Sequence, residues 1–145
     1  PVKAVREAVI TTLIEWHDKF VSVIYVNDES SVTTFHIIPS YIPKGFSQVE
    51  VPDESSGFYY GQFSDSHNNW FDILVLPIEN TQETFLDNEF STYYSINFNG
   101  IQAIWGIMND GSNTLLWERG TLSFQVCGNL DLTELIKISE KIKVE

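Results

Sequence analysis

Histidine, cysteine and clustered carboxylates are the side chains of this chain that could perform catalysis or hold a metal. His67 stands close to Asp65 and Asp72, and a metal ion would need three or more such ligands to converge. The segment 64–69, SDSHNN, is also typical of a polar hairpin loop. The other two histidines are scattered elsewhere in the sequence, and we therefore predict no metal site.

The single cysteine and the acidic pairs offer little for covalent or acid–base catalysis. Cys127 closes an expected strand, and no basic residue stands beside it to lower its pKa. Carboxylate pairs such as Glu50 with Asp53 are expected by chance among 20 acidic residues in 145. We predict no catalytic residues, no cofactor and no enzyme activity. A hydrolase that uses two such carboxylates is the third-ranked hypothesis.

Aromatic residues are the remaining candidates, and they make up 14% of the chain. Most fall on expected strands, where packing in a core explains aromatic side chains. In adjacent aromatic pairs, however, one ring must point to the opposite face of the sheet. An exposed patch there would be a binding surface, whereas a helix lying over it would make it core. The candidate surface residues are Tyr59, Tyr60, Tyr93, Tyr94 and Trp105.

Charge excludes two classes of partner. Acidic residues outnumber basic ones 20 to 8, which gives a net charge of −12. Nucleic acid and anionic membrane surfaces both require clustered lysine and arginine, so neither is expected to bind. Residue 1 is a proline and Met108 is the only methionine. We therefore expect an upstream segment outside this sequence, which would have to carry any membrane span.

An α+β fold in one domain over residues 1–145 would position these side chains. Residues 2–20 predict a long helix, because Val5, Val9 and Leu13 recur at helical spacing. The segment 80–83, NTQE, fits a capping box and predicts a short helical turn that reaches about residue 88.

Most of the chain between the two ends predicts antiparallel strands. Residues 21–127 contain enough strand patterns for a curled sheet of seven to nine strands. Residues 92–126 predict a four-stranded meander, with Asn99-Gly100 as its first tight turn. A C-terminal helix is expected over residues 131–142, capped by Asp131. The two helices would pack on the apolar face of the sheet.

Three stretches together resemble a bacterial family known as domain-of-unknown-function family 4367. The first is the opening helix over residues 4–20, and the second is the connector 41–46, YIPKGF. The third is the ending over residues 96–142, where a strand with Asn-Gly leads to LWERG, to a strand that ends in glycine and to the last helix. Order and spacing carry the resemblance, which spans nearly the whole chain.

The resemblance implies a setting rather than a reaction. Family members are usually the extracytoplasmic C-terminal part of single-span membrane proteins, many with an anti-sigma-like segment upstream. It implies no catalytic residue, and Trp117 and Gly120, which match its motif, are interpreted as core and turn residues. We therefore expect a non-enzymatic sensor or interaction domain linked to anti-sigma-type regulation, with a protein partner. The alternative is a binding module for a small apolar ligand in the concave face of the sheet.

Overall fold

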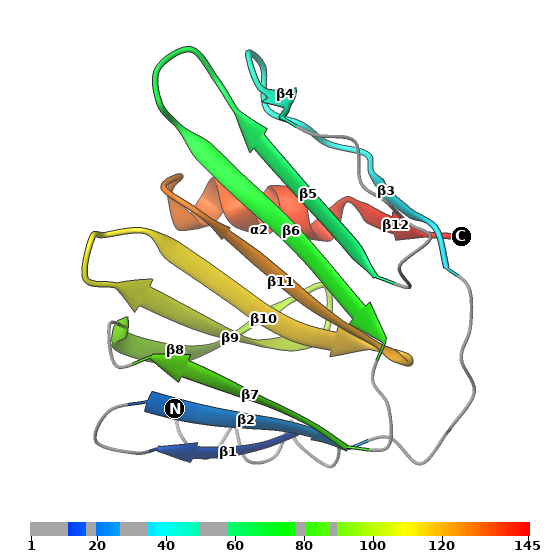
Figure 1. Ribbon diagram of the computed structural model, residues 1–145, viewed down its shortest axis with the longest axis vertical. Helices are drawn as coiled ribbons and strands as arrows, with labels where there is room; N and C mark the ends of the chain where they lie inside the picture. Colours follow the sequence, from blue (N-terminus) through cyan, green and yellow to red (C-terminus); the bar gives the residue numbers. More distant parts are fainter. Residues whose placement is uncertain (1–11, 17–19, 27–34, 50–57, 78–80, 88–89) are drawn as a thin grey trace.

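The structure is a computed structural model that describes residues 12–16, 20–26, 35–49, 58–77, 81–87 and 90–145. These residues form strands and one α-helix (Figure 1). The elements are β1 (Thr12–Trp16), β2 (Phe20–Val26), β3 (Ile37–Pro39), β4 (Ser47–Gln48), β5 (Tyr59–Ser64), β6 (Trp70–Pro77), β7 (Thr81–Asp87), β8 (Phe90–Phe98), β9 (Ile101–Met108), β10 (Asn113–Arg119), β11 (Leu122–Gly128), α2 (Leu132–Glu140) and β12 (Ile142–Val144).

A seven-stranded antiparallel sheet forms the centre of the fold, in the order β4-β5-β6-β11-β10-β9-β8. Its second half is the predicted meander, which is confirmed as β8 to β11. The meander then joins β6, because residues 122–128 of β11 pair with residues 71–77. The strands rotate from one edge of the sheet to the other, which gives it a strong twist (Figure 1).

The turn between β8 and β9 shows why the meander could be predicted. Asn99 has a φ of 51° and Gly100 a φ of 75°. Asparagine and glycine tolerate this left-handed conformation, and a turn of this kind matches the twist of the two strands it joins. Phe98 and Ile101 therefore face each other as the last pair of the hairpin.

Helix α2 packs on one face of the large sheet, against β10 and β11. Asp131 caps it, since its Oδ1 accepts a hydrogen bond from the Glu134 N–H at 2.9 Å. Leu135 and Ile138 are fully buried on the side that faces the sheet. The predicted C-terminal helix is thus confirmed up to Glu140, after which the chain forms β12 and pairs with β3. Nowhere in the described ranges does a helix reach the length and apolarity that a membrane crossing requires.

Two predicted helical segments are strands instead. Thr12–Trp16 is β1, so the expected long helix over residues 2–20 is wrong for this part; residues 2–11 lie outside the described ranges. Thr81–Asp87 is β7, where a helical turn was expected. Both segments pair with β2 in a separate three-stranded sheet, β1-β2-β7. Strand pairing has overridden the local helical pattern: β7 pairs with β2 from far away in the chain, and β1 pairs with it across a short connection.

The core lies between α2 and the large sheet. Alternate residues of the central strands point toward the helix and are almost completely buried. Phe71, Ile73 and Val75 on β6, and Phe124 and Val126 on β11, are at most 2% exposed. This packing fixes the side of the sheet on which each side chain described below must lie.

Candidate functional site

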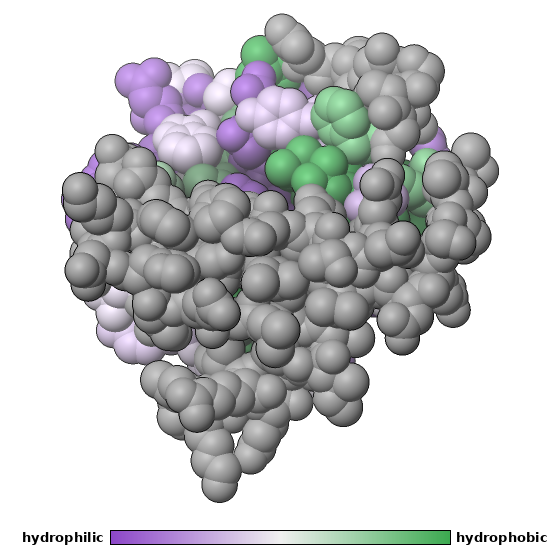
Figure 2. Space-filling model, turned by 60° about the horizontal axis from the view of Figure 1, so that its bottom comes forward, coloured by the Kyte–Doolittle hydropathy of each residue, from purple (hydrophilic) through white to green (hydrophobic). Residues whose placement is uncertain are grey.

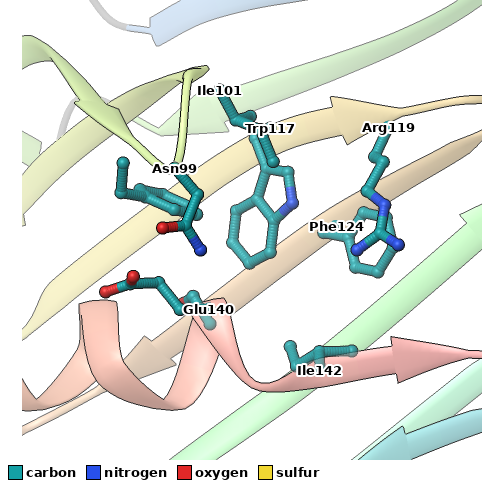
Figure 3. Close-up of a pocket in the computed structure, with 9 residues that line it drawn as sticks. Asn99, Ile101, Trp117, Arg119, Phe124, Glu140 and Ile142 are labelled. Atoms are coloured by element: carbon teal, nitrogen blue, oxygen red, sulfur yellow. The ribbon is translucent and has the colours of Figure 1, made fainter.

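A recess lies where the C-terminal end of α2 meets the large sheet. The strand ends of β8, β9, β10 and β11, the last residues of α2 and the start of β12 all border it (Figure 3). Its lining consists of Phe98, Asn99, Ile101, Trp117, Arg119, Phe124, Ser139, Glu140 and Ile142. These residues come together because Trp117 and Phe124 are direct cross-strand partners, as are Phe98 and Ile101.

Trp117 forms the floor of the recess and is only 4% exposed. Its ring stacks on Phe124 with centroids 5.2 Å apart, and the edge of Phe98 approaches it at the same distance. Contacts of this kind stabilise an aromatic cluster beyond simple burial. The indole therefore has a fixed orientation, and its nitrogen lies on the side of Arg119 (Figure 3).

The rim of the recess is polar and exposed. Asn99, Arg119 and Glu140 are all exposed, and Figure 3 shows Arg119 and Glu140 on opposite sides of Trp117. Among the described residues, neither charged side chain has an ion-pair partner, and the Trp117 N–H has no hydrogen-bond acceptor. A buried N–H of this kind needs an acceptor from the recess, either a water or a group of a ligand. This recess is thus suited to a group that accepts a hydrogen bond.

The size of the recess limits what can enter it. Its cavity volume is about 30 Å³, room for no more than a few waters. Ser139, which is buried at its edge, donates its hydroxyl to the Leu135 carbonyl at 2.7 Å. A whole drug-sized ligand needs a pocket of at least about 300 Å³, so only the end group of a ligand fits here.

A second polar cluster crosses the opposite face of the sheet. Gln62, Asp72, Cys127 and Thr114 are successive cross-strand partners on β5, β6, β11 and β10. Gln62 Nε2 donates to Tyr60 Oη at 2.8 Å, and Tyr60 donates to Asp72 Oδ2 at 3.2 Å. Burial raises the pKa of Asp72 above its ordinary value. The hydrogen bond from Tyr60 acts against this change.

Cys127 belongs to the same row but is not activated. Thr114 Oγ1 donates to its sulfur at 3.3 Å, and burial raises the pKa of the thiol. A raised pKa leaves the thiol protonated at neutral pH, so it is a poor nucleophile.

The surface of the molecule is mixed in polarity where its residues are described. Viewed with its bottom turned forward, the molecule shows hydrophobic and hydrophilic residues next to one another near the top (Figure 2).

The predicted aromatic surface is divided between the two faces of the sheet. Tyr59 is 3% exposed and belongs to the core, whereas Tyr60 is 41% exposed on the opposite face. Tyr94 and Trp105 lie together on the α2 side, with ring centroids 4.8 Å apart. The side chain of Tyr93 lies outside what the structure describes. The four residues whose side chains are described therefore do not form one patch, because adjacent strand residues alternate between faces.

The loop around His67 serves a structural purpose. Asp65 Oδ1 accepts hydrogen bonds from the backbone N–H groups of His67 and Asn69, and Asn69 Nδ2 donates to its Oδ2. These bonds lower the pKa of Asp65 and fix the turn between β5 and β6. In the described part of the chain, no three histidine, cysteine or acidic side chains converge as metal ligands.

Sequence reasoning missed the recess. It assigned Trp117 to the core, which is correct, but did not connect it with Arg119 or Glu140. Arg119 and Glu140 are 21 positions apart in the chain and border the same recess only because α2 packs over β10. An arginine two residues after a buried tryptophan on the same strand points to the same face, and this spacing was the available clue.

Comparison with known proteins identifies the family. The family model described as "Domain of unknown function (DUF4367)" matches residues 36–142, so the chain belongs to that family. No curated protein and no solved structure was found to match the chain.

Proposed function

We propose that this DUF4367 domain is a non-enzymatic sensor or interaction domain. It would work on the extracytoplasmic side of the cell membrane, in a protein anchored there by an upstream span and linked to anti-sigma-type regulation. The family resemblance supports this setting. The domain would detect a ligand or a protein partner and pass that information along the chain toward the anchor.

One observation carries the binding role: the buried Trp117 N–H without a partner beneath a charged rim. The donor lies beside a recess with room for a small polar group, so an acceptor that enters the recess can form the missing hydrogen bond. A buried polar group without a protein partner is a feature that functional sites share. The recess therefore supports recognition of a polar group.

The two other hypotheses receive less support from the described residues. In the case of an apolar ligand, α2 and its apolar residues occupy the helix-side face of the sheet, and the recess there has a polar rim and about 30 Å³ of space. In the case of a hydrolase, acid–base cleavage needs two carboxyl groups flanking the substrate. Glu140 is the one carboxylate in the lining of the recess.

A transcription measurement in the host tests the proposal. The full-length protein is replaced by a version that lacks residues 36–142, and by a full-length Trp117→Phe version that keeps the aromatic floor but loses the donor. We expect both versions to change expression of the genes that the protein regulates, with the deletion acting more strongly. The control is Thr133→Ala, an exposed site on α2. Unchanged expression in the deletion strain would refute the proposed role.

A further inference from the structure

We propose that the recess binds the head group of a free α-amino acid. The carboxylate of the ligand accepts hydrogen bonds from the Trp117 N–H and from Arg119, and its ammonium group faces Glu140. The side chain of the ligand points outward past the exposed rim. This inference rests on the proposed function and names the class of molecule that the domain detects.

The Trp117 side of the recess requires an acceptor. An indole N–H and a guanidinium can only donate hydrogen bonds. Trp117 is buried and held between Phe98 and Phe124, while Arg119 is exposed at the rim and without an ion-pair partner in the described chain. A carboxylate matches the planar fork of arginine and adds strength through its charge.

The Glu140 side requires a donor. A glutamate carboxylate only accepts hydrogen bonds, and Glu140 is the last residue of α2, where the helix dipole is negative. The Ser139 hydroxyl beside it already uses its hydrogen on the Leu135 carbonyl, so only its lone pairs remain. A cationic group of the ligand would satisfy both residues.

Charge and size together select a zwitterion. The chain has a net charge of −12, which repels an anion such as acetate from a distance. A free amino acid has no net charge and therefore escapes that repulsion, yet it presents both charges locally. The recess accommodates a few heavy atoms, which fits the head group alone. Glycine is accordingly the simplest probe.

Two-dimensional NMR of the ¹⁵N-labelled protein tests this directly, because each indole N–H gives its own signal. The chain has four tryptophans, and Trp117→Phe identifies the signal of Trp117 by its disappearance. We expect glycine to shift that signal in a saturable way. The signal of Trp105 is an internal reference, since its Nε1 already donates to Asn113 Oδ1 at 2.8 Å. Acetate and methylamine, at matched ionic strength, are expected to bind at least about fivefold more weakly than glycine.

Rim variants separate the two halves of the site. Arg119→Gln and Glu140→Gln replace exposed side chains, so both proteins should fold, and each should weaken glycine binding by about fivefold or more. The matched control is Lys137→Gln, an exposed α2 residue outside the recess. The proposal is overturned if glycine leaves the Trp117 signal in place, or if acetate binds as tightly as glycine. Either result would refute binding of an amino acid but not the sensor role, which the expression measurement in the deletion strain tests independently.

Discussion

Gly128 stands where the backbones of β11 and β6 leave no room for a side chain. A Cβ atom there would lie 2.5 Å from the Trp70 carbonyl oxygen and 2.8 Å from Phe71 Cβ. Gly128→Ala must therefore push two paired strands apart. We expect it to lower the free energy of unfolding by about 2–3 kcal/mol, measured by urea denaturation.

Gly61 provides the matched comparison for Gly128. A Cβ at Gly61 would also be too close to its neighbour, but that neighbour is the Tyr59 hydroxyl at 2.6 Å. Tyr59 is buried, but a side chain can still shift by rotating about its bonds, whereas two paired backbones must separate, so Gly61→Ala should cost less than Gly128→Ala. Equal losses at the two glycines would show that the close approach of β6 and β11 is not the cause.

Asp72 should make the protein less stable as pH rises through the acidic range. Burial holds its pKa above the ordinary value of 3.8. The folded state thus keeps a proton that the unfolded state has already lost, and the free energy of unfolding falls as pH rises through this interval. Asp72→Asn removes the titration and still accepts the hydrogen bond from Tyr60. We expect the variant to be more stable than the natural protein at pH 7 and equal to it near pH 3, in urea denaturation at each pH.

Asp65 offers a control with the opposite sign. Hydrogen bonds from Asn69 and from the turn backbone lower the pKa of Asp65. At pH values above the ordinary pKa of an aspartate, the ionised carboxylate therefore stabilises the folded state. Asp65→Asn should therefore be less stable than the natural protein at pH 7, with the difference disappearing on acidification. If both aspartate variants changed stability in the same direction, the assigned environments would be wrong.

At the scale of elements, the N-terminal cap of α2 is the clearest local determinant. Asp131 accepts from the Glu134 N–H, and an unsatisfied N–H at a helix start costs about 1 kcal/mol. Asp131→Ala should lower the free energy of unfolding by about that amount. Asp131→Asn keeps an acceptor in the same place and should cost much less. Thermal unfolding monitored by circular dichroism distinguishes the two, and equal losses would exclude capping as the cause.

Elements were predictable where local chemistry and tertiary pairing agree. Asn99-Gly100 demands a left-handed turn whatever surrounds it, and Asp131 caps a helix whose apolar stripe faces the sheet. The helices predicted at Thr12–Trp16 and Thr81–Asp87 are wrong because the helical patterns there are local, whereas both segments pair with β2 as strands. For Thr81–Asp87 this partner strand lies far away in the chain. Residues such as threonine and isoleucine in these segments also favour strands.

At the scale of the whole molecule, the recess could not be derived from sequence for a related reason. Alternation placed Trp117 in the core correctly, but it cannot say which helix residue approaches the end of a given strand. Glu140 reaches the rim only through the direction in which α2 crosses β10 and β11. Strand alternation therefore predicts the buried floor of the recess, whereas the rim depends on how the helix packs on the sheet.

Because α2 completes the core, we expect it to unfold together with the sheet. Leu135 is fully buried against the sheet, so Leu135→Ala leaves a cavity and should cost about 2–5 kcal/mol, a large share of the about 5–15 kcal/mol typical of a domain. Since the helix completes the core, tryptophan fluorescence and far-ultraviolet circular dichroism should report the same shifted midpoint.

Thr133→Ala is the control on the same helix, because Thr133 is exposed and its loss should change stability by less than about 0.5 kcal/mol. In the Leu135→Ala protein, separate midpoints for the two probes would mean that α2 detaches while the sheet stays folded. The rim would then lose Glu140 before the floor loses Trp117, and the recess would open without unfolding. A shared midpoint instead ties the integrity of the recess to the stability of the whole domain.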